Sequence, residues 1–319
     1  MQKITLKSLR FLRRVIKNDP GNFGRNWKLF SNKYYSNKLI SEALMGEEPC
    51  MIARLGSTET NCIVNYLGVS QQEKFKTYSG FIDSKTPMWW WDTANVKNMN
   101  IWSGFFPCDL KNIERFCELM IECMPDVDIL GSWLRQETFF ENQFHNAKKV
   151  MLEDLEPFFS EKPWTQSLLR KKVLVVHPFA DSILSQYSKR EKIFPDGLLP
   201  EFELTVLKAV QTVAGEQSKF KTWFDALEFM KGEIVKINFD ICIIGCGAYG
   251  FPLASFVKGM GKKAIHMGGV TQLMFGVLGK RWEKYEVFPY QNLFNEYWVR
   301  PNASETPKRA HLVENSSYW

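Results

Sequence analysis

The sequence predicts an α/β protein with a Rossmann-like, mostly parallel, doubly wound sheet and helices on both faces. Short aliphatic runs alternate along the chain with segments in which apolar residues recur every three or four positions. Each run is closed by a glycine, histidine or proline, as buried strands commonly are. Strands that alternate with helices form βαβ units, and such units build a parallel sheet that is covered on both faces.

Five runs are expected to be buried strands, at residues 51–55, 127–130, 173–176, 241–244 and 264–267. A sixth run, residues 202–213, fits either a strand or a helix. Apolar spacing predicts helices at residues 113–124, 137–158, 223–231 and 252–258. Residues 68–108 break this rhythm with aromatics and turn formers, and they predict a loop-rich insertion over the strand ends. It is either a lid or acceptor wall, or a packed loop without a functional role.

Length and composition favour one ordered domain over residues 1–319, with a helical N-terminal extension (1–40) and a C-terminal tail (285–319) that packs on it. The chain has 319 residues, of which 45% are hydrophobic, so it can bury a large core. Its net charge of +6 suits phosphate-bearing small molecules and is too small to argue for nucleic acid. The seven cysteines have apolar neighbours and are expected to be mostly buried thiols in a reducing compartment. With no secretion signal and no long apolar run, the chain is expected to be cytoplasmic.

The expected active surface lies at the carboxyl ends of the strands. In open α/β sheets, ligands bind there because glycine turns and helix N-termini present free backbone N–H groups. This rule nominates five loops, at residues 54–59, 131–133, 177–181, 245–250 and 268–272.

The clearest motif is a GxGxxG sequence that directly follows an expected strand and precedes a helix. It reads Gly245-Cys246-Gly247-Ala248-Tyr249-Gly250. Such a turn can cradle a phosphate, although glycines can also serve only tight strand-to-helix packing. A dinucleotide-binding unit also needs an acidic residue at the end of the next strand to bind the ribose. No acid stands there, which leaves a phosphate or nucleotide cradle.

The first strand ends in Arg54-Leu55-Gly56-Ser57-Thr58-Glu59. Gly56 permits a sharp turn, and Ser57 or Thr58 is placed to cap the next helix. Arg54 offers a bidentate fork for phosphate. Glu59 offers a carboxylate for a metal, a sugar hydroxyl or a proton, or it only stabilises the positive end of the helix.

Two further strand ends carry candidate ligand contacts. His177 can donate to a phosphate or sugar oxygen, although a satisfied core histidine is commoner. Asp181 is expected to be the N-cap of the next helix. Gly268 and Gly269, with Gln272 after them, add a second glycine turn beside the GxGxxG loop. The sequence contains no GxSxG elbow, Walker A motif, HExxH motif or kinase signature, so the common hydrolase, NTPase, protease and kinase classes lack their key residues.

With these motifs in view, the chain resembles the bacterial GT-D fold glycosyltransferases of adhesin and surface-polysaccharide glycosylation. The family shows an arginine followed by Gly-Asp-Gly-Glu where this chain has the 54–59 loop. The C-terminal half adds five further strings, namely residues 245–254 (GCGAYGFPLA), 261–269 (GKKAIHMGG), 272–276 (QLMFG), 279–282 (GKRW) and 295–301 (NEYWVRP). The resemblance covers most of the chain.

The resemblance implies a hexosyltransferase-like enzyme that moves a sugar from a nucleotide-sugar donor to a glycan or lipid-linked acceptor. It implies that Arg54, Gly247, Ala248 and Tyr249 hold the donor and that Glu59 orients the sugar or helps to deprotonate the acceptor. The family's Asp-x-Glu, which is linked to metal binding, falls on residues 57–59, where Ser57 replaces the aspartate. A Mn²⁺ or Mg²⁺ ion is therefore either lost or held by substrate phosphates with another acid such as Glu137 or Asp181.

Two other functions stay open on sequence grounds. The first is an NAD(P)- or nucleotide-sugar-dependent oxidoreductase that uses the same GxGxxG. The second is a non-catalytic binding protein of a glycan pathway, which the missing aspartate favours. Residues 1–17 show apolar residues at helical spacing and six cations. This segment either docks on its own domain or lies on an anionic bilayer at the inner face of the membrane.

Overall fold

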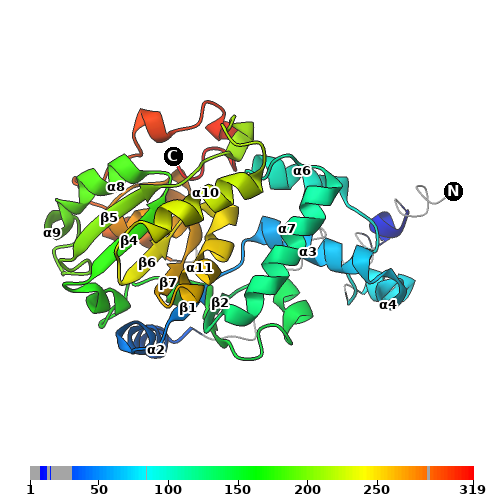
Figure 1. Ribbon diagram of the computed structural model, residues 1–319, viewed down its shortest axis with the longest axis horizontal. Helices are drawn as coiled ribbons and strands as arrows, with labels where there is room; N and C mark the ends of the chain where they lie inside the picture. Colours follow the sequence, from blue (N-terminus) through cyan, green and yellow to red (C-terminus); the bar gives the residue numbers. More distant parts are fainter. Residues whose placement is uncertain (1–7, 13–14, 16–30, 84, 286–287) are drawn as a thin grey trace.

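Figure 1 shows the computed structural model, which describes residues 8–12, 15, 31–83, 85–285 and 288–319. Its centre is a seven-stranded sheet in the order β3-β2-β1-β7-β6-β4-β5, and neighbouring strands pair in parallel. The strands are β1 Cys50–Ala53, β2 Ile129–Ser132, β3 Lys148–Met151, β4 Lys172–His177, β5 Glu203–Lys208, β6 Ile241–Ile244 and β7 Lys263–His266. The predicted α/β class with a parallel sheet is confirmed.

The described α-helices that cover the sheet are α2 Lys33–Met45, α3 Ser57–Ser70, α7 Leu110–Cys123, α8 Ala180–Tyr187, α9 Arg190–Ile193, α10 Trp223–Val235 and α11 Gly250–Gly259. Successive strand residues point to opposite faces, so Met51 and Ala53 join one core while Cys50 and Ile52 join the other. The first core also contains side chains from α3, α7, α10 and α11, and the second contains side chains from α2 and α8. Helices on both faces make the sheet doubly wound.

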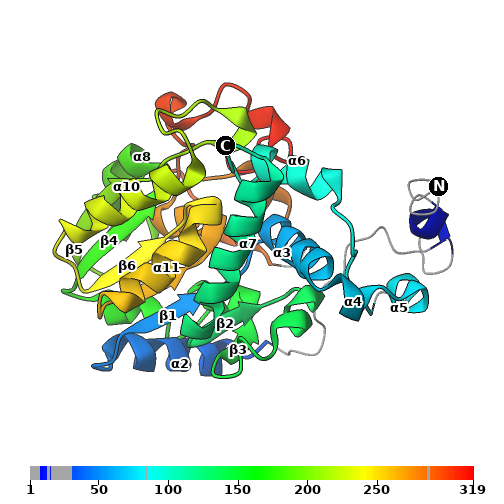
Figure 2. The same cartoon turned by 45° about the vertical axis from the view of Figure 1, so that its right-hand side comes forward.

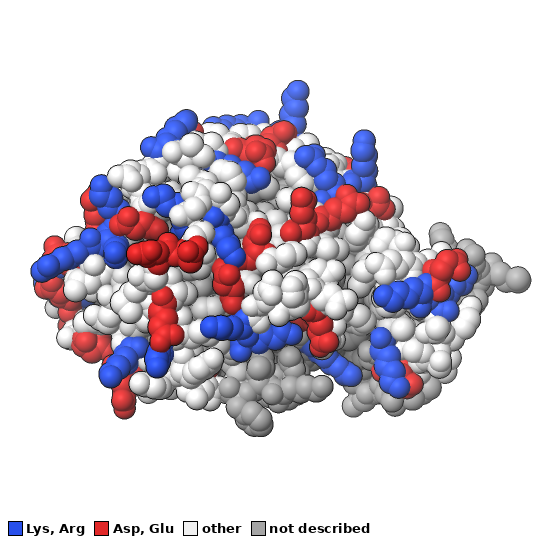
Figure 3. Space-filling model, turned by 60° about the horizontal axis from the view of Figure 1, so that its bottom comes forward, with Lys and Arg blue, Asp and Glu red and all other residues white. Residues whose placement is uncertain are grey.

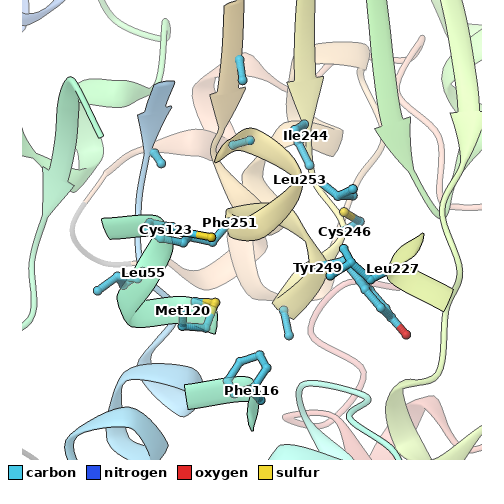
Figure 4. Close-up of a cluster of buried hydrophobic side chains, with 14 of the residues drawn as sticks. Leu55, Phe116, Met120, Cys123, Leu227, Ile244, Cys246, Tyr249, Phe251 and Leu253 are labelled. Atoms are coloured by element: carbon cyan, nitrogen blue, oxygen red, sulfur yellow. The ribbon is translucent and has the colours of Figure 1, made fainter. Parts of the chain in front are cut away.

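Helix α11 is held firmly behind the GxGxxG loop. It packs against β1, β7 and α7, and Figure 4 shows Phe251 of α11 beside Cys123 of α7. Tyr249 precedes this helix and lies in the same buried cluster, with its ring stacked on Trp223 at a centroid distance of 4.6 Å. The first turn of α11 therefore has a fixed position relative to the strand ends.

The predicted helix at residues 137–158 is wrong. The segment forms a 3₁₀ turn (η2 Arg135–Phe140), strand β3 and another 3₁₀ turn (η3 Leu152–Leu155). Because β3 is an edge strand that starts with Lys148, which is exposed, it lacks the aliphatic run that marks the central strands. The ambiguous run at 202–213 is a strand over its first half, and this strand, β5, forms the other edge.

The 68–108 insertion is more helical than expected, with α4 Gln72–Phe75, α5 Tyr78–Ile82 and α6 Thr93–Ile101. Trp89 and Trp90 pack on Phe81 and on each other, at centroid distances of 5.1 to 5.7 Å. Leu9 joins this small cluster from the N-terminal segment. Most of the tryptophan-rich stretch therefore builds a satellite core, and Trp102 is the tryptophan of this stretch that reaches the site described below.

Three further observations bear on the composition and the termini. All seven cysteines are free, and six are buried as expected. None of the described helices combines the length and the apolar character needed to cross a membrane. In both ribbon views the C-terminal segment, drawn in red, runs over the top of the molecule above α8 and α10 (Figures 1 and 2).

Candidate functional site

A cavity of about 350 Å³ lies where the carboxyl ends of β1, β6 and β7 meet the helices that follow them. The rule that ligands bind at strand carboxyl ends predicts this place. Nine of the sequence-predicted site residues line the cavity, namely Arg54, Gly56, Ser57, Thr58, Glu59, Gly247, Ala248, Gly268 and Gly269. They come from three separate loops, which the parallel pairing of β1 with β7 and of β7 with β6 brings together.

Arg54 is the central cation of this cavity. Its guanidinium lies over the ring of Trp133, with Cζ 5.2 Å from the ring centroid. Its Nε is buried, and no described residue accepts a hydrogen bond from it. Burial lowers the pKa of Arg54 from its ordinary value, and the negative charge of Glu59 partly offsets this; arginine stays protonated in either case. An unpartnered buried donor beside an open cavity is suited to an anionic ligand.

Glu59 lies in the first turn of α3, and Gly56 is the N-cap residue. The prediction that Ser57 or Thr58 caps this helix is wrong, because Gly56 occupies that position and no side chain caps the end. The Glu59 carboxylate folds back over Gly56, so closely that a Cβ at residue 56 would overlap it. Glycine at position 56 therefore leaves room for the Glu59 carboxylate at the N-terminus of α3.

The three glycines of the GxGxxG loop have three different roles. Gly245 lets the chain pass close to His177 and Thr271, and Gly250 leaves room for the ring of His266. Gly247 has φ +58°, and a Cβ placed there would meet no atom within 4 Å. Gly247 therefore combines a left-handed conformation with an open face toward the cavity, which is the geometry needed for close approach of a ligand.

His266 is a cavity residue that the sequence reasoning missed. It is buried at the end of β7, and its Nδ1 lies 3.2 Å from the Ile244 carbonyl oxygen, so Nδ1 donates and Nε2 is the acceptor nitrogen of the neutral ring. Burial, with a further contribution from the charge of Arg54, lowers the pKa of His266 to about 3, so the ring is neutral. His266 stands at the strand end where a dinucleotide-binding protein carries an acidic residue. That position could have indicated from the sequence that His266 faces the ligand site.

A second, smaller chamber of about 100 Å³ adjoins the first over the ends of β4 and β6, and both are lined by Ser103, Gly247 and Gly269. Its described lining includes no Asp, Glu, Lys or Arg side chain. Several buried polar atoms of this chamber lack hydrogen-bond partners among the described residues, and Ser103 Oγ and Gln272 Oε1 are two of them. This chamber suits an uncharged part of a ligand with hydrogen-bonding groups.

His177, Tyr249, Gln272 and the glycine Gly245 line this second chamber rather than the first. The Phe179 backbone N–H donates to His177 Nδ1 at 3.0 Å, which places the ring proton on Nε2. Burial lowers the pKa of His177 to about 3, so this histidine is also neutral. Its Nε2–H is therefore a neutral donor.

No protein-family model, curated protein or solved structure matches this chain.

Three predicted site residues lie outside both chambers, and one of them is Gly250, which leaves room for the ring of His266. Glu137 is buried and accepts hydrogen bonds from the Ser132 hydroxyl and from the Trp133 and Leu134 backbone N–H groups. Burial raises its pKa above the ordinary value, and these hydrogen bonds oppose the rise. Glu137 therefore holds the loop that carries Trp133, and the structure does not place it at the cavity as a catalytic group.

Asp181 is an exposed residue of α8, and Phe179 is the N-cap, so the prediction of an Asp181 cap is wrong. Its carboxylate pairs with Lys208 at 3.6 Å on the surface. Its backbone N–H is bound by Glu305, whose carboxylate reaches across from the C-terminal region and replaces the expected cap. Asp181 is therefore not part of the described lining of either chamber, although Phe179 before it lines the smaller one.

The C-terminal region contributes cavity residues that the sequence reasoning did not select. Arg281, from η8 Lys280–Lys284, pairs with Glu314, and both line the larger chamber. The ring of Tyr318 lies against Gly269, where a Cβ would overlap it. The backbone carbonyl of Tyr318 accepts a hydrogen bond from Gln272 Nε2 at 3.1 Å. Their position over the site depends on tertiary packing, which no local pattern shows.

The described side chains do not form a metal site. No group of three or more His, Cys, Asp or Glu residues among them could hold a metal ion. The larger chamber has two carboxylates in its described lining, and Glu314 is already paired with Arg281, which leaves Glu59. One carboxylate is a poor ligand set for Mn²⁺ or Mg²⁺, so no chemical step is assigned to a metal here.

Proposed function

We propose that this protein is a glycosyltransferase that moves a sugar from a nucleotide-sugar donor to a glycan or lipid-linked acceptor in surface-polysaccharide biosynthesis. The observation that carries the proposal is the buried guanidinium of Arg54, whose Nε has no described partner, beside the helix ends that follow β1 and β6. Backbone N–H groups at such helix ends and a guanidinium both bind phosphate oxygens. The resemblance stated above supplies the sugar and the acceptor class.

In the proposed reaction, an acceptor hydroxyl oxygen forms a bond to the anomeric carbon of the sugar while the bond from that carbon to the diphosphate oxygen breaks. The leaving nucleoside diphosphate takes the electron pair and gains negative charge. Arg54 and the N–H groups of the Gly247 loop stabilise this charge. The acceptor proton passes to Glu59 or, through it, to solvent.

The division of charge between the two chambers supports a ligand with charged and uncharged parts. Arg54 and Arg281 both lie in the larger chamber, whereas no charged side chain was found in the described lining of the smaller one. A nucleotide sugar has this character, because its phosphates are anionic and its base and sugar are neutral. On the face shown in Figure 3, described basic and acidic side chains are interspersed rather than gathered into the continuous basic surface that suits nucleic acid.

A dehydrogenase that uses the same loop is the first rival. The neutral His266 at the end of β7 does not supply the carboxylate that such enzymes use for the ribose hydroxyls. A titration of the protein with NADH, followed by fluorescence, separates the two functions, since the proposal expects no saturable change.

A thermal-shift panel tests the donor class. UDP-, GDP-, CMP- and dTDP-sugars are each added with and without Mn²⁺, and a ligand that binds the folded state raises the Tm. We expect one nucleotide class to raise the Tm and an Arg54→Gln variant to lose that response. If no nucleotide sugar shifts the Tm, the proposal is wrong, and a non-catalytic role without this ligand takes its place.

The N-terminal segment suggests where the enzyme works. Most of residues 1–17 lie outside the described residues, but Leu9 is buried against the insertion while Phe11 and Val15 are 66% and 64% exposed. Exposed apolar groups among cations are suited to an anionic bilayer, so we place the enzyme at the inner face of the membrane. Sedimentation with phosphatidylglycerol vesicles, with and without residues 1–17, tests this. If the full-length protein stays in the supernatant at low salt, the proposed location at the membrane is wrong.

A further inference from the structure

An ion pair of the protein itself occupies one wall of the larger chamber. Arg281 and Glu314 are paired there, and both side chains line the cavity. The pair is partly exposed, at 33% for Arg281 and 47% for Glu314. Exposed pairs of this kind contribute little to stability, so Arg281 can exchange partners at small cost.

Glu314 is held in this place by an unusual backbone. Glu314, Asn315 and Ser316 are three successive non-glycine residues with φ of 44°, 56° and 66°. L-residues adopt this left-handed conformation at an energetic cost, and such strain is typical of segments that take part in function. The turn is what directs the Glu314 carboxylate back toward Arg281.

The residues on either side of the turn are tied to the same wall. The Arg281 backbone N–H donates to the Ser317 carbonyl oxygen at 2.9 Å, and the Arg281 guanidinium lies 4.8 Å from the centroid of the Tyr318 ring. Arg281 therefore keeps its position through Ser317 and Tyr318 when its ion pair with Glu314 is broken.

The charges of the chamber are balanced without a ligand. Its described lining contains two cations, Arg54 and Arg281, and two carboxylates, Glu59 and Glu314, and an ion pair joins Arg281 to Glu314. We propose that Glu314 is a specificity-determining residue, because it pairs with Arg281 where a second phosphate group of a ligand would bind. A ligand with one phosphate binds Arg54 alone. A diphosphate also takes Arg281 from Glu314, so the chamber distinguishes diphosphates from monophosphates.

This inference rests on the phosphate site of the proposed function, and inorganic pyrophosphate and phosphate test it without any sugar or base. Glu314→Gln removes the competing charge, so pyrophosphate should bind about five- to tenfold more tightly, because the binding-competent fraction of Arg281 rises. Calorimetric titration of the full chain gives the affinities. If Glu314 only supported the fold, replacing it with glutamine would not be expected to increase the affinity for pyrophosphate.

Glu283→Gln is the matched control. Glu283 pairs with Arg300, has a similar exposure of 39%, and is not in the described lining of either chamber. The Glu283→Gln substitution also removes one negative charge from the C-terminal region, so a general electrostatic effect would appear in both Glu283→Gln and Glu314→Gln. Pyrophosphate affinity in Glu283→Gln should equal that of the wild type.

Arg281→Gln completes a double-mutant cycle. We expect this variant to lose the preference for pyrophosphate over phosphate, and the further change Glu314→Gln to have no effect in its background. The inference is wrong if Glu314→Gln binds pyrophosphate no more tightly than the wild type, or if its gain persists without Arg281. Wild-type protein that binds neither anion refutes the proposed function itself, and this inference with it.

Discussion

Trp133 lies against the guanidinium of Arg54, with the ring centroid 5.2 Å from Cζ. The ring is fixed from two sides, because its Nε1–H donates to the Leu55 carbonyl oxygen at 3.0 Å and its backbone N–H donates to Glu137 at 3.1 Å. Two neighbouring strand ends, those of β1 and β2, therefore support one cation. Arg54 is oriented before any ligand arrives, which lowers the cost of binding.

Replacing Trp133 with leucine should weaken binding of a phosphate-bearing ligand. The lost cation–π contact is worth about 1 kcal/mol, which is about fivefold in affinity. Trp133→Phe keeps an aromatic face and should lose less. Calorimetry with the donor found in the thermal-shift panel measures the difference. Equal affinity in the wild type and Trp133→Leu would show that the ring does not orient Arg54.

Replacing Glu59 with glutamine should lower the rate of sugar transfer by about 10²- to 10⁴-fold, the range typical of a lost acid or base. Glutamine keeps the shape of the side chain over Gly56, so the fold should be preserved. Glu73→Gln is the control, since Glu73 is also in the first turn of a helix but lies outside both chambers. Near-normal turnover by Glu59→Gln would leave Glu59 as a stabiliser of α3 alone.

Replacing Gly247 with valine should abolish donor binding. The side chain would enter the open space that faces the cavity, and it disfavours the φ of +58°. Gly261→Val is a matched control, because Gly261 has φ +75°, also faces open space, and lies outside the described lining of both chambers. Both variants should lose roughly 1–2 kcal/mol of stability from left-handed strain. Only Gly247→Val should lose the donor-induced rise in Tm, and a normal rise would mean that the loop serves packing.

Stability should depend on pH through Glu156, a buried carboxyl that accepts a hydrogen bond from the Tyr290 hydroxyl. Burial raises its pKa to about 7 from 4.5, against the opposing effects of Tyr290 and Lys33. The folded state therefore holds the proton more tightly than the unfolded chain. The stabilisation that the bound proton contributes is complete below pH about 4.5 and is lost as the pH rises through about 7, a difference of about 3 kcal/mol. Urea unfolding from pH 4.5 to 8 should show a shallower decline for Glu156→Gln, and parallel curves would contradict the buried-proton account.

The central strands of the fold could be predicted because they are buried on both faces. β1 and β6 are wholly apolar, and β4 and β7 have apolar residues between a first lysine and a last histidine. The carboxyl ends of these strands predicted the loops that line the two chambers. The edge strand β3 escaped prediction because Lys148 and Lys149 need no burial there. Edge strands carry a weaker hydrophobic signal than central ones.

The site was predictable only where it depends on local chain geometry. Arg54 and Gly247 follow strands directly, so their positions could be read from the strand ends. Arg281 and Glu314 come together through the path of the C-terminal segment over the sheet, which is a tertiary property. Glu137 was predicted to lie at the site, and a contact within its own loop is the reason that it does not. Its carboxylate closes its own loop instead of facing the cavity.

The most direct test is the release of nucleoside diphosphate from a nucleotide sugar by purified full-length protein. A panel of donors, with and without a glycan acceptor, is assayed for the wild type and for Arg54→Gln. One donor should be consumed, faster with acceptor than without, and Arg54→Gln should lose at least about 10²-fold of that rate, as for other lost charge-stabilising donors. No release from any donor, or release that is unchanged in Arg54→Gln, would contradict the proposal that this cavity transfers sugars.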